Sequence, residues 1–251
     1  MSSEFAPAST QRARHREEAR ERQRAETKSE ILRHARGLLV DEGPAAVSLR
    51  AIAREMGMTA PGLYRYYADH RELVQALTAS LYDELAAALE HARDQAPEQS
   101  PRGRFTATAR ALRAWALSHK PEFALIFSKP IPDAGCAPGD PCHTASWRFG
   151  GVVVGLMTEF WRAGTLPLPR PGTLDPGWLP QLEEVREHLG SAQPPLEALY
   201  VFVLAWSRLY GMVSMEVFGH LDFALTDPGP LFEHNLRDIL GLLDTGPGND
   251  Q

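Results

Sequence analysis

The chain has 251 residues, which is enough for one large domain or two small ones with a core that needs no cross-links. Its hydrophobic fraction of 43% and charged fraction of 23% are typical of water-soluble globular proteins. The longest apolar run, residues 150–157, is too short to cross a bilayer, and the N-terminus is charged where a signal peptide would be apolar. We therefore expect a cytoplasmic protein.

The net charge of -6 is unevenly distributed along the chain. Residues 1–75 carry 13 Lys and Arg against 11 Asp and Glu, whereas the remainder carries 13 against 21. The N-terminal third is therefore the part of the chain suited to face a polyanion such as nucleic acid.

Residues 1–26 are rich in Arg and Glu and offer few apolar side chains to bury. Such a composition predicts a flexible, solvated arm. Six arginines lie between Arg12 and Arg24, so an alternative is that this basic arm enters a DNA minor groove.

Helical periodicity begins at Thr27. Thr27 and Glu30 have the spacing of a capping box, and Gly43 and Pro44 interrupt the pattern, which predicts a first helix over residues 27–42. Its apolar stripe consists of Ile31, Ala35, Leu38 and Leu39.

Two short helices follow, and then a long one. Ser48 can cap the first, Gly57 can take the positive φ at its end, and Thr59 can cap the second. Asp69 and Glu72 form another capping box, which opens a leucine-rich helix reaching about residue 95. Two short helices joined at a glycine, with a helix packed behind them, predict a helix-turn-helix.

The second short helix would present polar aromatic residues outward. Pro61 suits the first helical turn, where its missing N–H costs nothing, and Leu63 would face the core. Tyr64, Arg65 and Tyr66 would then lie on or near the exposed side, where tyrosine hydroxyls can donate to DNA phosphates. The alternative is that the tyrosines form a half-buried packing patch.

Residues 27–77 resemble the DNA-binding region of the tetracycline-repressor (TetR) family of bacterial regulators. The family pattern is found at Ile52-Ala53, Gly57, Thr59, Leu63-Tyr64, Tyr66-Tyr67 and Leu73. The resemblance implies a homodimer, a C-terminal domain for ligand binding and dimerisation, and repression relieved by a small molecule. It also implies the DNA-contacting positions Ser48, Arg50, Thr59, Ala60, Gly62, Tyr64, Arg65, Tyr66, His70 and Arg71.

Two positions depart from the family pattern. His70 stands where a phosphate-binding lysine is common, which makes that contact doubtful or dependent on pH, and Arg71 follows it. Gly62 replaces a small residue with a methyl group that could touch thymine, although a glycine also lets the helix backbone approach the duplex.

The rest of the chain also reads as helical. Helical segments are predicted over residues 105–119, 145–164, 196–221 and from about 228 to 243, with proline-rich loops between them. Since no alternating strand pattern occurs, the predicted class is all-α, with about nine helices. The predicted divisions are an arm over 1–26, a DNA-binding domain over 27–73, a ligand-binding and dimerisation domain over 74–245, and a tail over 246–251.

The C-terminal domain offers two sets of candidate residues. Aromatic side chains predicted to wall an apolar ligand cavity, with packing into an ordinary core as the alternative, are Trp115, Phe123, Phe127, Trp147, Phe160, Trp161 and Trp206. Residues predicted to meet a second copy across a four-helix bundle are Leu199, Val203, Tyr210, Gly211, Ser214, Leu236, Ile239 and Leu243.

The segment around Trp206 and Gly211 also resembles a Trp-His-Gly-type subgroup of the family, although Tyr210 stands where many members have His. Cys136, Cys142 and His143 match no common zinc spacing, so we expect two free thiols in a loop and neither a metal nor a cofactor.

The sequence therefore predicts a repressor released from a palindromic DNA operator by a small, largely apolar ligand. An activator, or a helical scaffold that no longer binds DNA specifically, are the alternatives. An enzyme is disfavoured because none of the common catalytic or nucleotide-binding motifs is found in the sequence.

Overall fold

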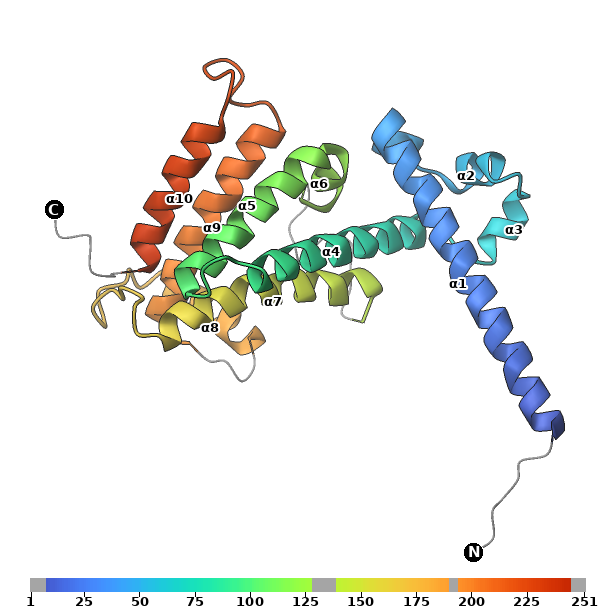
Figure 1. Ribbon diagram of the computed structural model, residues 1–251, viewed down its shortest axis with the longest axis horizontal. Helices are drawn as coiled ribbons and strands as arrows, with labels where there is room; N and C mark the ends of the chain where they lie inside the picture. The colour runs from blue at the N-terminus through green and yellow to red at the C-terminus, as the bar shows by residue number, and fades with distance from the viewer. Residues whose placement is uncertain (1–7, 128–138, 190–193, 245–251) are drawn as a thin grey trace, which may run out of the picture.

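The computed structural model describes residues 8–127, 139–189 and 194–244. All regular structure in these ranges is helical, which confirms the predicted all-α class. Figure 1 shows two groups of helices, α1 to α3 at one end and α5 to α10 at the other, with α4 running from the first group into the second. The long helix α4 therefore positions the two groups relative to each other.

The N-terminal group contains α1 (Ala8–Glu42), the short 3-10 helix η1 (Pro44–Ala46), α2 (Leu49–Glu55) and α3 (Ala60–Tyr64). Ile31 and Ala35 of α1, Ile52 of α2 and Leu63 of α3 are fully buried in their shared core. The stripe predicted from helical periodicity is thus the face that holds the three helices together.

Helix α1 starts much earlier than the sequence pattern predicts. Thr27 is not an N-cap, because its hydroxyl donates to the carbonyl of Gln23 at 2.9 Å inside the helix. The expectation of a flexible arm is therefore wrong for residues 8–26, while residues 1–7 lie outside the described ranges. Ala, Arg, Gln and Glu are strong helix formers, so this segment can extend a helix that tertiary packing has already nucleated further along.

Helix α4 (His70–Asp94) begins at the predicted capping box. The Glu72 amide donates to the Asp69 carboxylate at 2.8 Å, and the Glu72 carboxylate accepts from the Ala68 amide at 2.6 Å. Its buried leucines, spaced four residues apart from Leu73 to Leu89, then face the other helices along the whole length of α4. The cap fixes where α4 starts, directly after the helix-turn-helix.

The C-terminal group packs around α4, with α5 and α7 as its main neighbours and α9 paired with α10. The sequence pattern does not predict two of its helices, α6 and α8. The bounds are α5 Pro101–Ser118, α6 Lys120–Phe127, α7 Pro141–Arg162, α8 Leu179–His188, α9 Leu196–Val217 and α10 Gly229–Leu243.

By length and composition alone, α9 would be able to span a membrane, the only such helix in the described ranges. Here it belongs to the protein core, since Ala205, Leu209 and Val213 are buried against neighbouring helices. Its apolar character is explained by this packing.

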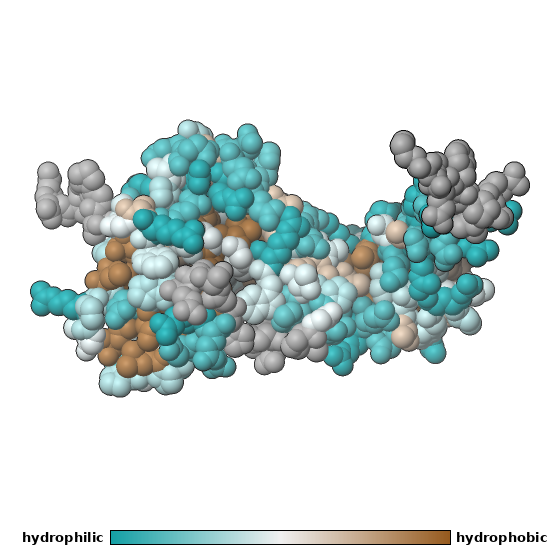
Figure 2. All heavy atoms as spheres, turned by 90° about the horizontal axis from the view of Figure 1, so that it is seen from below, coloured by the Kyte–Doolittle hydropathy of each residue, from teal (hydrophilic) through white to brown (hydrophobic). Residues whose placement is uncertain are grey.

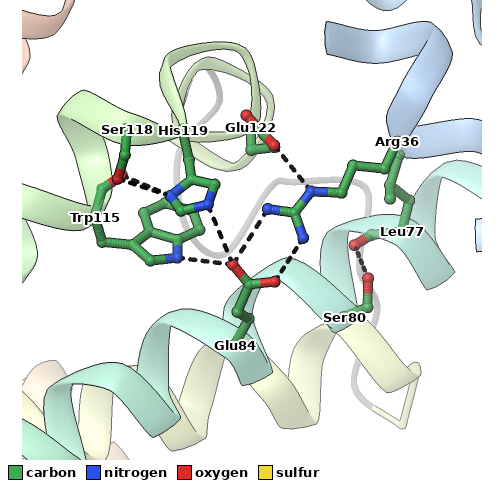
Figure 3. Close-up of polar contacts among 8 residues, drawn as sticks. All are labelled: Arg36, Leu77, Ser80, Glu84, Trp115, Ser118, His119 and Glu122. Carbon is green, nitrogen blue, oxygen red and sulfur yellow. Dashed lines mark hydrogen bonds and ion pairs between the residues drawn. The ribbon is translucent and has the colours of Figure 1, made fainter. Parts of the chain in front are cut away.

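A polar cluster joins the two groups of helices (Figure 3). The Arg36 guanidinium of α1 donates to both oxygens of Glu84 on α4, at 2.6 and 3.2 Å, and to Glu122 on α6 at 2.9 Å. The Trp115 indole of α5 donates to Glu84 at 3.0 Å, and the His119 ring lies 3.7 Å from the same carboxylate. Four helices from both groups are thus tied at one point.

A second, more enclosed ion pair holds α5 to α9. Arg113 donates twice to Glu216, at 2.7 and 2.5 Å, and its guanidinium lies 5.0 Å from the centroid of the Phe232 ring. The Glu216 side chain is only 6% exposed, so losing its partner would leave a buried charge uncompensated.

We expect Glu216→Ala to lower the free energy of unfolding by about 3 kcal/mol, because it leaves Arg113 without its partner in a largely buried site. Glu233→Ala is the matched control, since Glu233 also binds an α5 arginine twice, Arg110 at 2.9 and 2.8 Å, but in an exposed position. That control should cost less than about 1 kcal/mol. Chemical denaturation measures the free energy of unfolding of both variants. Equal losses would contradict the claim that the Arg113–Glu216 pair matters more because it is buried.

The Glu84 cluster also predicts a dependence of stability on pH. Burial raises the pKa of Glu84, but hydrogen bonds from Arg36 and Trp115 outweigh it and lower the pKa below the usual 4.5. This stabilisation is therefore complete above the unfolded-state pKa and is lost as pH falls through the lower folded-state pKa. Glu84→Gln should reduce the loss of melting temperature between pH 6 and 3, whereas the exposed-site variant Glu21→Gln should leave it unchanged.

Candidate nucleic-acid interface and C-terminal hollows

Local capping builds the helix-turn-helix as predicted. The Ser48 hydroxyl accepts from the Ala51 amide at 3.2 Å, and the Thr59 hydroxyl accepts from the Gly62 amide at 3.3 Å. Gly57 has a φ of 64°, the left-handed conformation that lets the chain turn between α2 and α3. Ser48 and Thr59 therefore have structural roles at the two helix starts that the interface would use.

Helix α3 ends in a tyrosine that faces outward, and the two tyrosines that follow the helix are turned inward. Tyr64 is 48% exposed and Arg65 is exposed beside it. Tyr66 is half-buried under the Arg24 guanidinium, 5.8 Å from its ring centroid, and Tyr67 is buried beside Lys28. The expected outward side therefore consists of Tyr64 and Arg65, while Tyr66 packs against α1.

The environment of Tyr67 agrees with a structural role. Burial, with a smaller contribution from the charge of Glu72, raises the pKa of its phenol to about 12. The phenol therefore stays neutral in the core at any physiological pH.

The absence of a side chain at Gly62 is explained by contacts within α3. A Cβ atom at this position would come within 3.2 Å of the Thr59 hydroxyl oxygen, which is a tight contact with the capping group. The glycine thus leaves room for the cap as well as for close approach of another molecule.

The remaining predicted contact positions surround α3. Arg50 on α2 and Arg71 on α4 are exposed, and Ala60 is half-buried at the start of α3. His70 is exposed as a residue, but its Nε2 lies 2.9 Å from the Val47 carbonyl and donates to it. Because this nitrogen already makes a hydrogen bond within the protein, His70 links the loop before α2 to the start of α4.

Two small apolar hollows lie among the described residues of the C-terminal group. The first has a volume of about 300 Å³, including space open to solvent, and lies between α7 and α9, where Trp161 and Leu199 line it. The second, of about 260 Å³ on the same measure, lies among α4, α5, α7 and α9; Leu89, Phe105 and Trp206 are among its lining residues.

The predicted cavity residues thus separate into three groups. Trp161 and Trp206 line the hollows. Trp147 does not belong to a cavity wall, because it is 43% exposed and its indole donates to the His143 ring at 2.8 Å. The others are packed in the core and do not line either hollow, namely Trp115, Phe123, Phe127 and Phe160.

Several residues predicted to meet a second copy are buried within this chain. Periodicity marks an apolar face but does not say which neighbour covers it. Tyr210 points inward, with its hydroxyl donating to the Phe127 carbonyl at 3.2 Å, while Val203, Gly211 and Ser214 are half-buried. The prediction is wrong for the residues that are at most 3% exposed in the protomer, Leu199, Leu236, Ile239 and Leu243.

Cys142 lies buried in the first turn of α7 and is disulfide-bonded, so the expectation of a free thiol in a loop is wrong for this residue. Cys136 lies outside the described residues. Spacing in the sequence could not reveal this, because it does not report which thiols meet in space.

Comparison with known proteins agrees with the geometry. Residues 31–77 match the family described as bacterial regulatory proteins, tetR family, and residues 105–239 match the tetracyclin repressor-like C-terminal domain. The HTH-type transcriptional regulator Rv1816 of Mycobacterium tuberculosis is 31% identical over 225 residues, covering 88% of this chain and 93% of that protein.

Solved structures show the same fold. Regulatory protein SCO4313 is 30% identical with a TM-score of 0.68, covering 88% of this chain and 98% of its own. A protein from Rhodococcus sp. RHA1 is 25% identical with a TM-score of 0.61, covering 84% and 94%. With a capped helix-turn-helix, a matching C-terminal domain and a relative similar over most of its length, this chain belongs to the TetR family of transcriptional regulators.

Proposed function

We propose that the protein is a dimeric repressor that binds a palindromic operator through α3 and is released by a small, largely apolar ligand. The observation that carries this proposal is the outward position of Tyr64 and Arg65 at the end of α3, together with the exposed Arg50 on the neighbouring helix α2. A tyrosine hydroxyl and guanidinium groups are suited to phosphate oxygens and base edges. Operator binding would take place in the cytoplasm, where the DNA is located.

The second hollow supports a link between ligand and DNA. Leu89, which lines it, belongs to α4, and the same helix starts at His70 directly beside the helix-turn-helix. A ligand that enlarged this hollow would push on α4 and tilt it. Because two recognition helices must meet half-sites about 34–36 Å apart at the same time, such a tilt would break the match.

The polar cluster at Glu84 would transmit that movement. Arg36 lies on α1 and binds Glu84 of α4 and Glu122 of α6, so α4 cannot shift without stretching contacts to α1. The helix-turn-helix would then move with α4 as one unit. An activator would use the same DNA-binding helix and the same movement of α4. A reporter assay with the upstream region distinguishes activation from repression.

A face of α9 supports the proposed dimer. Met215 and Phe218 are 42% and 44% exposed there, and the hydroxyl of Ser214 is buried with no hydrogen-bond partner in the described part of the chain. Separately from this face, Figure 2 shows further apolar surface at the end of the C-terminal group far from α2 and α3. The resemblance of this segment to the Trp-His-Gly-type subgroup remains a prediction.

The DNA-binding proposal is tested with fragments of the gene's own upstream region in a titration of salt and competitor DNA. Arg50→Ala should weaken binding about tenfold and lower the slope of log affinity against log salt by about 1, because it removes one cation next to the phosphates. Tyr64→Phe should weaken binding without changing that slope, since it removes a hydroxyl but no charge.

Arg170→Ala is the matched control, because Arg170 is also exposed but lies in the loop after α7. It should bind as the unaltered protein does. A loss with Arg170→Ala equal to that with Arg50→Ala would show that only net charge matters and would contradict the assigned face.

The dimer is tested by substituting Gly211, since a Cβ atom there meets nothing within 4 Å in the protomer. Gly211→Glu should leave the protomer folded, but it should convert dimer to monomer in sedimentation, because a charged side chain would block close approach of two α9 helices. Gly151→Glu on α7, where a Cβ atom also meets nothing, should remain dimeric. A dimer that persists in Gly211→Glu would place the interface elsewhere.

A further inference from the structure

The N-terminal part of α1 reaches beyond the helix-turn-helix. Figure 1 shows α1 continuing past α3, so that its first turns stand clear of α2 and α3. Residues 14–26 are all exposed, which means that packing within this chain does not account for them. Helix-forming residues can continue α1 through these turns, but helical stability in proteins comes mostly from tertiary packing, so the exposed sides of this segment are available to another molecule.

One side of this extension carries a row of three arginines, with Glu17 at the edge of the row. Arg16, Arg20 and Arg24 are spaced four residues apart, which places them on one side of a helix. Ile31 follows Arg24 by seven residues, or about two turns, and therefore lies on the same side. Since Ile31 is fully buried in the core shared with α2 and α3, the arginine face points to the side of α1 on which those helices lie.

The last arginine of this row confirms its direction. The Arg24 guanidinium donates to the carbonyl of Arg65, the residue after α3, at 3.2 Å and covers the Tyr66 ring. The row thus starts at the C-terminal end of α3 and continues away from it. From Arg24 to Arg16 it covers eight residues, or about 12 Å of helix.

The other two arginines of the described extension are placed differently. At 100° per residue, Arg14 and Arg22 point away from this row, with Glu18 between them and Glu21 beside Arg14. Glu18 also forms a pair with His15 at 3.5 Å, and its carbonyl accepts from Arg22 at 3.4 Å. Among the described residues, no ion pair joins Arg16 or Arg20 to a carboxylate. The same holds for Arg14 and Arg22, so the two pairs of arginines differ in the side of α1 that they face and not in how their charge is compensated.

We propose that this extension is a second DNA-binding element, in which Arg16 and Arg20 contact the phosphate backbone of the operator flank beyond the half-site read by α3. The inference rests on the proposed operator binding. A duplex is the polyanion that α3 already places on this side, and about 12 Å corresponds to about 3 to 4 further base pairs at 3.4 Å each. These contacts supply affinity and register without reading sequence.

The test compares two double variants of the full chain that lose the same charge. Arg16→Gln with Arg20→Gln should weaken binding to duplex DNA about tenfold or more near 0.1 M salt, and it should lower the slope of log affinity against log salt by about 2. Arg14→Gln with Arg22→Gln should change affinity less than twofold. Gln and Arg have similar helix propensities, so helix content by circular dichroism should be equal in both.

Two DNA probes separate this inference from the proposed function. Because phosphate contacts do not depend on sequence, the Arg16 and Arg20 loss must occur on a random duplex as well as on the operator, even if no operator preference is found. With an operator in hand, removing the flanking base pairs from the probe should abolish the difference between the two variants. Equal losses in both variants, or no loss in either, would overturn the inference.

Discussion

A single carboxylate holds the two halves of this protein in register. Glu84, midway along α4, binds Arg36 of α1 and Trp115 of α5, and Arg36 also reaches the buried Glu122 of α6. These contacts are directional, so they specify how α1 lies across α4 in a way that apolar packing alone would not. Because α2 and α3 pack on α1, the orientation of the DNA-facing surface is set at this point, far from that surface.

Helix α4 connects the helix-turn-helix to the C-terminal group. Its first residue, His70, is fastened to the loop before α2, and Leu89 near its other end lines a hollow among α4, α5, α7 and α9. One continuous helix therefore has one end at the DNA-facing domain and the other at a hollow of the C-terminal group. In the function that we propose, a change in the hollow would alter the spacing of two recognition helices without any contact between ligand and DNA.

Capping residues close to each helix start made the N-terminal domain predictable from the sequence. Features without such local signals were harder to predict. Ser48, Thr59 and the Asp69–Glu72 pair each sit beside the amide that they cap, so spacing alone located α2, α3 and the start of α4. The start of α1 was missed, because an Arg- and Glu-rich segment can be solvated coil or exposed helix. The buried positions of Leu236, Ile239 and Leu243 could not be distinguished from an interface by pattern, since both require the same apolar face.

The central claim is that two copies of α3 meet two half-sites at a spacing set through α4. Footprinting of the purified protein on its upstream DNA tests this most directly. The account predicts two protected half-sites with two-fold symmetry, whose centres are about 34–36 Å apart along the duplex, with protection extending a few base pairs beyond each. Protection that spreads evenly along the fragment, without symmetric half-sites, would contradict it.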